Sequence, residues 1–445
     1  MNKIPQTVRI IHTKDYNVDV LYIKEFLRTI GCLTCNYIKR DNLQLTSEEK
    51  KQQYDVNIFY GLNEDISQSN MRNEIYIKES FIKSAGSRDN ILTAIIDGIW
   101  PQGQYRLIRS EIKKILEFYG PIATCLYNNV NIGFISEYCP VNNDGAEVIE
   151  LKKRICGLTY DAFLKCYNEL YNYKKNNTKQ KLSVYYEYTM LNLKHRINEI
   201  KKLDHQEAIF DVTKMINDAR KILEKKEDFI IVYYRLATIC KFDSMYEWNA
   251  EEYYWEVIER LDGLHEVPKM LKSIFYYNLG RYYEKNMGNK ELAYKCYLQS
   301  NENNPHAYRT LFKLAKIEEE KQNYKEVIHI LNKIIENLID DYKDKYDYGQ
   351  LMPREQIYVF KVYRLMGDTF YQMGELQYAE KAYLKAIEIS RVKSRYFIEM
   401  QTGIDKEFEK LLKISMSSDA IYRKLINCVS RDGDEEKYRE YLSLC

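Results

Sequence analysis

The stretch that decides the fold is Tyr363-Arg364-Leu365-Met366-Gly367-Asp368-Thr369-Phe370, followed by Ala379, Tyr383 and Ala386. The small residue Ala379 follows Gly367 after twelve positions. An aromatic residue follows each of them within one helical turn, Phe370 after Gly367 and Tyr383 after Ala379. Two helices can cross closely only where their side chains are small, so the spacing predicts that Gly367 and Ala379 face each other in a helix hairpin. Residues 373–375 are the predicted turn, because a glycine such as Gly374 commonly ends a helix.

The same pattern occurs twice more upstream. One copy contains Tyr276, Leu279, Gly280, Tyr283, Ala293, Tyr297, Ser300 and Pro305. The next contains Leu314, Ala315, Val327, Leu331 and Ile334, with the alanine in the place of the glycine. These copies resemble the tetratricopeptide repeat (TPR), a helix–turn–helix unit of about 34 residues. The resemblance covers residues 272–391 and implies an all-α solenoid; a set of ordinary amphipathic hairpins is the alternative.

Composition narrows the class of protein. The chain has 445 residues, enough for more than one domain, with 45% hydrophobic and 30% charged residues, as in globular proteins. The net charge of +2 argues against nucleic acid as a partner. No segment resembles a secretory leader or a membrane helix of about 18 apolar residues, which predicts a cytoplasmic protein without a membrane partner. Cys32 and Cys35 supply at most half of a zinc site, so we expect no metal and no cofactor.

The first 120 residues follow another pattern. Short apolar runs at residues 7–12, 32–38, 54–60 and 74–77 predict strands, and helical spacing at residues 19–30, 91–99 and 105–119 predicts helices. Strands of buried type that alternate with helices predict a small parallel sheet. We therefore expect an α/β domain at residues 1–120, a connector at 121–145, degenerate helical repeats at 146–271, and a TPR array with C-terminal capping helices at 272–445.

The predicted α/β domain resembles a Toll/interleukin-receptor (TIR) or a related flavodoxin-like domain. The resemblance rests on an opening strand that runs into residues 12–15, His-Thr-Lys-Asp, and on a third strand that ends in a polar loop. TIR enzymes that cleave nicotinamide dinucleotides use a glutamate after the third strand, and this implies Glu64. Glu74 in the predicted fourth strand is a second candidate, and His12 is a third because α/β folds place ligands at strand ends. The Trp-Cys-x-x-Glu pattern of these enzymes is absent.

The repeats also predict a partner-binding surface. In TPR arrays the first helix of each pair lines the concave face, around the glycine positions. The residues that this implies are Tyr277, Arg281, Arg309, Phe312, Lys316, Lys361, Arg364 and Tyr371. Cations beside aromatic rings suit a peptide with acidic and apolar residues. Glu284, Glu319 and Asp368 lie nearby in the sequence, and a solvated charged face is the alternative interpretation.

Together these patterns predict a cytoplasmic signalling or adaptor protein. Its TPR groove would bind a protein or peptide, and its α/β domain would be a degenerate TIR-like effector or docking module. One alternative is a TIR-like NAD hydrolase regulated by its TPR domain, as in bacterial antiphage defence, with NAD as the bound dinucleotide. Another is a sensor of a small signalling nucleotide. Self-association of the chain is compatible with each of these hypotheses.

Overall fold

The computed structural model describes residues 5, 7–13, 17–40, 43–47, 54–62, 73–100, 106–119, 146–177, 183–203, 206–241, 243–263, 269–339, 348, 351, 353–392 and 403–443. The chain divides into two compact units, Met1–Val130 with Cys156–Lys272 and Asn131–Ile155 with Ser273–Cys445. They are called the first and the second unit below, and each is described by itself. Glu64 and the connector predicted at residues 121–145 lie outside the described residues.

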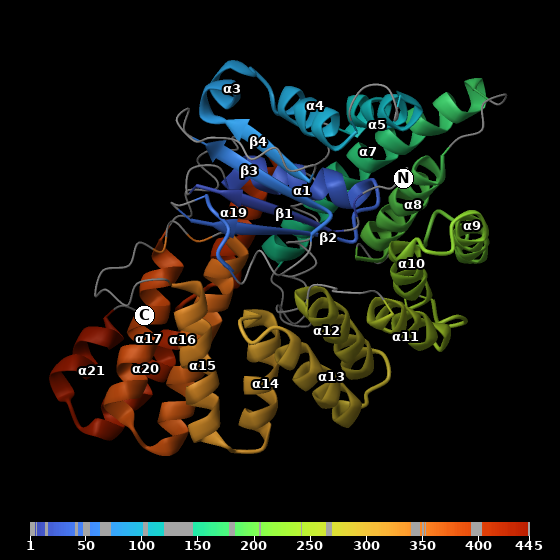
Figure 1. Ribbon diagram of the computed structural model, residues 1–445. Helices are drawn as coiled ribbons and strands as arrows, with labels where there is room; N and C mark the ends of the chain where they lie inside the picture. Colours follow the sequence, from blue (N-terminus) through green and yellow to red (C-terminus); the bar gives the residue numbers. More distant parts are fainter. Residues whose placement is uncertain are drawn as a thin grey trace. The chain divides into compact units, whose positions relative to one another are not determined.

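The first unit contains a four-stranded parallel sheet (Figure 1). Its strands are β1 (Thr7–His12), β2 (Thr34–Lys39), β3 (Val56–Leu62) and β4 (Glu74–Lys78), in the order β2-β1-β3-β4. Ile10 in β1 pairs with Tyr37 on one side and with Ile58 on the other. Residues 8–12 of this central strand are all buried, because a parallel sheet is covered on both faces. The predicted parallel sheet is confirmed.

Helices pack against this sheet and continue the first unit. Those of the sheet region are α1 (Asn17–Thr29), α3 (Glu79–Ser84), α4 (Arg88–Ile99) and α5 (Arg106–Tyr119). α1 and α4 contact each other as well as strands, so they cover the same face of the sheet. The later helices are α7 (Ala146–Asn176), which belongs to this unit from Cys156 onward, α8 (Val184–Leu203), α9 (Val212–Lys225), α10 (Ile230–Cys240) and α11 (Asn249–Asp262).

A glycine joins the sheet region to the later helices of the first unit. Gly31 follows α1 with a φ of +115°, a conformation that residues with a side chain rarely adopt. A Cβ added at Gly31 would lie 2.6 Å from Cζ of Phe229, which directly precedes α10, and 3.6 Å from the ring of Tyr188 on α8. The end of α1 therefore packs closely on both helices. β2 begins at Thr34, two residues later than predicted.

The second unit is helical throughout its described residues. Its helices are α12 (Lys269–Lys285), which belongs to this unit from Ser273 onward, α13 (Lys290–Asn303), α14 (Tyr308–Glu320), α15 (Tyr324–Leu338), α16 (Pro353–Met373), α17 (Leu376–Arg391), α19 (Gly403–Ser415), α20 (Asp419–Asp432) and α21 (Glu435–Leu442). Consecutive helices pair, α14 with α15, α16 with α17 and α20 with α21, and each pair packs on the next. Residues 272–391 thus form the predicted array of helix pairs.

The packing inside the pairs explains the glycine positions of the repeat. A Cβ added at Gly367 would lie 2.4 Å from the ring of Tyr383, and one at Gly280 would lie 2.8 Å from the ring of Tyr297. The close neighbour of each glycine is therefore the aromatic ring of the second helix. This refines the expectation that Gly367 faces Ala379, which is itself fully buried. α16 ends as predicted, with Gly374 at a φ of +80°.

Candidate partner-binding surface

Cations surround an aromatic ring where α12 meets α14. The guanidinium of Arg309 lies 4.7 Å from the ring centroid of Tyr277, and that of Arg281 lies 6.0 Å from the same centroid. Arg281 is one helical turn beyond Tyr277, so both side chains share a face of α12. Tyr277 is buried and the two arginines are half-buried. The structure thus brings three of the predicted residues into contact.

An aromatic cluster continues from α14 to α16. The ring of Tyr358 lies 4.9 Å from that of Tyr308 and 5.6 Å from that of Phe312, both edge to face. Burial raises the pKa of Tyr308, and the charge of Arg354 opposes this rise. Arg354 and Tyr308 are therefore electrostatic neighbours, which extends the cationic character of the surface to the start of α16.

These residues together are called the basic-aromatic surface. It consists of Tyr277, Arg281, Tyr308, Arg309, Phe312, Arg354, Tyr358 and Lys361. Lys361 lies one turn beyond Tyr358 on α16, so it continues the same face. The surface holds four cationic side chains, and carboxylates lie close to it as well: Glu355 acts on Tyr308, and Glu284 acts on Tyr297 together with Arg281. This arrangement can attract a negatively charged segment through its half-buried cations. Of its four rings, that of Tyr308 is half-buried, whereas Tyr277, Phe312 and Tyr358 are buried.

Three of the eight predicted residues lie outside this cluster. Lys316 is exposed and forms an ion pair with Glu319 of its own helix at 2.7 Å. Arg364 is exposed on α16. The ring of Tyr371 lies 4.8 Å from the guanidinium of Arg431 on α20. Their part in partner binding stays a prediction.

Three members of the basic-aromatic surface were missed from the sequence. Tyr308, Arg354 and Tyr358 precede the positions around which the repeat pattern was read. α16 begins at Pro353, nine residues before the last repeat's pattern starts at Val362, and Arg354 and Tyr358 lie on this extension. Their spacing before Lys361, seven and three residues, is the helical signal that could have found them.

Two of the candidate catalytic residues, His12 and Glu74, lie in the described part of the chain, and they are not brought together. His12 ends β1, is fully buried, and its Nδ1 lies 2.7 Å from the carbonyl oxygen of Thr13. Glu74 begins β4, where its carboxylate accepts a hydrogen bond from the Tyr76 hydroxyl. Glu74 is level with Asn57 of β3, whereas His12 is level with Tyr60, three residues further along that strand. Glu74 thus lies toward the amino ends of the strands, away from the carboxyl ends where open α/β sheets bind ligands.

At the carboxyl ends of β1 and β3 the structure shows an ion pair instead. Arg88 at the start of α4 donates from Nε to Asp19 of α1 at 2.7 Å, and the Tyr60 hydroxyl donates to the other oxygen of Asp19 at 3.0 Å. These bonds join two helices to the central strands, so they hold the sheet region together. Sequence reasoning did not find this set, because its three members are far apart in the chain.

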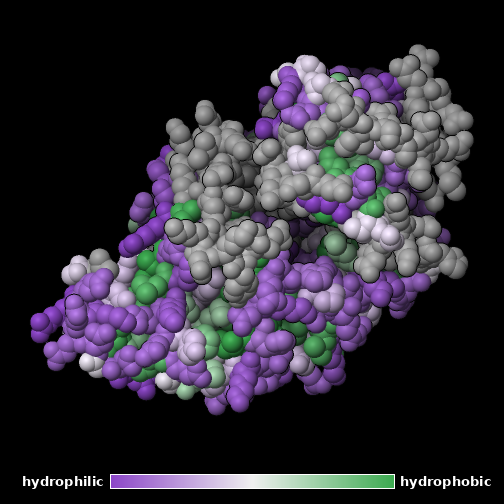
Figure 2. All heavy atoms as spheres, turned by 60° about the vertical axis from the view of Figure 1, so that its left-hand side comes forward, coloured by the Kyte–Doolittle hydropathy of each residue, from purple (hydrophilic) through white to green (hydrophobic). Residues whose placement is uncertain are grey.

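The described ranges contain neither a metal site nor a membrane-spanning helix. In that part of the chain no three His, Cys, Asp or Glu side chains are grouped so that they could hold a metal ion. No described helix has the length and apolar content needed to cross a membrane. The face shown in Figure 2 is predominantly hydrophilic, with apolar side chains visible between the polar ones. Recognition through charged and aromatic side chains agrees with this surface.

Comparison with known proteins gave matches among solved structures alone. No protein-family model and no curated protein matches the chain. It is similar to MamA, at 14% identity over 48% of this chain and 96% of that chain, with a TM-score of 0.31. It is similar to YrrB, a TPR protein with an unusual peptide-binding site, at 13% identity over 54% and 97%, with a TM-score of 0.30. It is also similar to yeast Tom70, at 11% identity over 79% and 69%, with a TM-score of 0.37.

TM-scores this low mean that the chain does not superpose as a whole on any of these proteins. The repeat assignment therefore rests on the chain's own packing. Its paired helices place Gly280 and Gly367 against aromatic rings of the second helix, at the positions that the TPR-like pattern predicts. The class of protein that this defines is a TPR-like array of helix pairs preceded by a parallel-sheet region.

Proposed function

We propose that the chain is an adaptor that holds an acidic peptide segment of a protein partner on the basic-aromatic surface. The observation that carries this proposal is the contact of Arg281 and Arg309 with the ring of Tyr277. Guanidinium groups bind carboxylates through paired hydrogen bonds, and the half-buried ring of Tyr308 can contact an apolar residue beside the acidic ones. Helix pairs that stack in an array present such residues along one continuous face.

The sheet region of the first unit has a supporting role in this proposal. Its strand order, β2-β1-β3-β4, is the order of the first four strands in doubly wound domains of flavodoxin type. We propose a TIR-like or flavodoxin-like docking domain for signalling, and not a catalytic one. The position of Glu74 at the amino end of β4 supports this choice.

Binding of the full chain to an array of synthetic peptides tests the adaptor proposal. Peptides that combine Asp or Glu with Leu, Phe or Trp should bind, and the same peptides with Lys in place of the acids should not. The double change Arg281→Gln and Arg309→Gln should weaken binding by about tenfold or more, because each charged hydrogen bond contributes about 1.5–3 kcal/mol. Higher salt should weaken binding of the unchanged chain, since the contacts are electrostatic.

A matched control removes two charges from the second helix of a pair. Lys381 and Lys385 lie on α17, and their change to Gln leaves the basic-aromatic surface intact. This control variant should bind the acidic peptides as the unchanged chain does. Equal binding of acidic and basic peptides, or equal losses in the two double variants, contradicts the proposal.

A further inference from the structure

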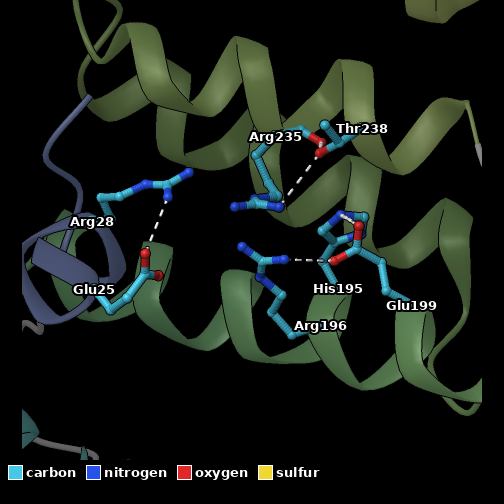
Figure 3. A network of polar contacts seen from close by, with 7 residues as sticks. All are labelled: Glu25, Arg28, His195, Arg196, Glu199, Arg235 and Thr238. Atoms are coloured by element: carbon cyan, nitrogen blue, oxygen red, sulfur yellow. Dashed lines mark hydrogen bonds and ion pairs between the residues drawn. The ribbon is translucent and has the colours of Figure 1, made fainter. Parts of the chain in front are cut away.

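A buried polar seam lies in the first unit, where α1, α8 and α10 meet (Figure 3). It contains Glu25 and Arg28 of α1, His195, Arg196 and Glu199 of α8, and Arg235 and Thr238 of α10. These seven residues are called the arginine seam. The close packing of Gly31 on Phe229 and Tyr188 brings α1 to the two other helices.

Both carboxylates of the arginine seam have cationic or imidazole neighbours. Glu25 pairs with Arg28 at 3.3 Å. Glu199 lies 3.1 Å from a guanidinium nitrogen of Arg196 and 3.4 Å from Nε2 of His195. Burial by itself raises the pKa of Glu199, but His195 and the two arginines Arg196 and Arg235 outweigh it and hold this pKa well below the usual value. Glu199 is therefore ionised.

His195 contributes no positive charge near neutral pH. Burial lowers the pKa of His195 to about 4, although the carboxylate of Glu199 acts in the opposite direction. Three guanidiniums, on Arg28, Arg196 and Arg235, thus face two carboxylates, on Glu25 and Glu199. The arginine seam carries one more positive charge than its own side chains balance.

Arg235 is the arginine of the seam whose carboxylate neighbour, Glu199, acts on it only beyond ion-pair distance. Arg235 is 6% exposed. Within the described part of the chain its guanidinium reaches one acceptor, the Thr238 hydroxyl at 3.5 Å, and its Nε–H meets none. That distance exceeds the about 2.7–3.2 Å of a normal N–H···O bond. Burial of a guanidinium costs free energy, and the more distant Glu199 offsets this cost only in part, so an anion in direct contact with Arg235 would stabilise the fold.

A second buried polar side chain near the seam, that of Asn192, also has an atom without a hydrogen-bond partner in the described ranges. Asn192 lies one turn before Arg196 on α8, is 4% exposed, and its buried Oδ1 meets no donor in the described ranges. A half-turn of the amide about its axis exchanges oxygen and nitrogen, and Asn192 then offers N–H groups on the same face as Arg196. Figure 3 shows Arg28 entering from α1 and pointing toward the side of the seam where Arg196 and Arg235 lie.

We propose that the arginine seam binds a phosphate group, which Arg235 holds together with Arg196 and Arg28. The planar fork of arginine matches phosphate oxygens, and several forks around one anion give specific binding. The bound anion supplies Arg235 with a negative charge at contact distance, and Asn192 adds a neutral donor. The ligand is inorganic phosphate or a small molecule that carries a phosphate group. This site does not depend on the peptide-binding proposal.

Thermal unfolding of the full chain tests the site. Inorganic phosphate, added at constant ionic strength in place of chloride, should raise the melting temperature in a saturable way, because a ligand that binds the folded state stabilises it. ADP is added in a parallel series; a larger rise with ADP identifies a nucleotide as the source of the phosphate. Protein as purified is also denatured and assayed for released phosphate, and a stoichiometric release supports the proposal equally.

Variants locate the effect. Arg235→Met should lose the response to phosphate, and without phosphate it should melt at or above the temperature of the unchanged chain, because a buried unbalanced charge is gone. Arg28→Gln, at a more exposed position, should weaken phosphate affinity by about tenfold. Arg220→Gln is the control, since Arg220 lies on α9 and donates to the Tyr253 hydroxyl outside the seam.

The control variant should respond to phosphate as the unchanged chain does. The proposal is overturned if phosphate and ADP neither bind nor are released from the purified chain. It is also overturned if Arg235→Met responds as fully as the unchanged chain, or if this variant melts well below it in chloride, because Arg235 would then be balanced by the protein itself.

Discussion

At the scale of single residues, glycines fix how closely the helices approach. Gly367 in α16 and Gly157 in α7 are both inside helices, where a glycine ordinarily costs stability relative to alanine. Their surroundings differ. A Cβ at Gly367 would lie 2.4 Å from the Tyr383 ring, whereas a Cβ at Gly157 would meet nothing within 4 Å. The same chemical change should therefore have opposite signs at the two positions.

We predict that Gly367→Ala lowers the free energy of unfolding by about 1–3 kcal/mol, because the ring of Tyr383 must move. Gly157→Ala should raise it by about 0.5–1 kcal/mol through helix propensity alone. Urea unfolding followed by circular dichroism measures both. A stabilising effect of Gly367→Ala would show that the two helices do not pack as described.

At the scale of elements, shared carboxylates link successive helix pairs. Glu284 on α12 accepts hydrogen bonds from the hydroxyl of Tyr297 on α13 at 2.5 Å and from Nζ of Lys313 on α14 at 2.8 Å. Asp368 on α16 repeats the arrangement, with Tyr383 on α17 at 2.7 Å and Lys424 on α20. In each case the tyrosine belongs to the same pair and the lysine to a later helix.

We predict that Tyr383→Phe destabilises the second unit by about 2 kcal/mol, because the buried ring stays while the bond to the charged Asp368 is lost. Tyr378→Phe is the matched control on the same helix, since that side chain is 57% exposed. Urea unfolding compares the two variants. Equal stabilities would mean that the hydroxyl of Tyr383 contributes nothing to the pair.

The elements were largely predictable, because their signals are local. Apolar runs and glycine stops are read within one segment, and they placed four strands and the paired helices of the array. Contacts between side chains of different elements were harder to predict from the sequence. Arg354 and Tyr358 join the basic-aromatic surface through an extension of α16, and the seam at Arg235 depends on three helices far apart in the chain. No spacing rule connects such residues.

At the scale of the whole molecule, the alternative of a dinucleotide hydrolase needs a carboxylate at the carboxyl ends of the strands. Glu74 lies at the amino end of β4, and Asp19, at the carboxyl end of the sheet, is engaged by Arg88 and Tyr60. A carboxylate whose oxygens already accept hydrogen bonds from two side chains is poorly placed to act as a general base or nucleophile.

We predict that the full chain releases no nicotinamide from NAD, with or without a bound peptide. Liquid chromatography of the incubated dinucleotide measures this. The variants Glu64→Ala and Glu74→Ala serve as controls. Turnover by the unchanged chain that disappears in either variant would replace the adaptor proposal with the enzymatic one.

The carboxylates of Glu284 and Asp368 have a mechanical consequence. Each carboxylate bonds both to the other helix of its own hairpin and to the hairpin that follows. Neighbouring repeats are therefore expected to unfold together, because the unfolding of one repeat destabilises the next. In single-molecule force spectroscopy, such an array should unfold in one cooperative step and not in a series of small steps.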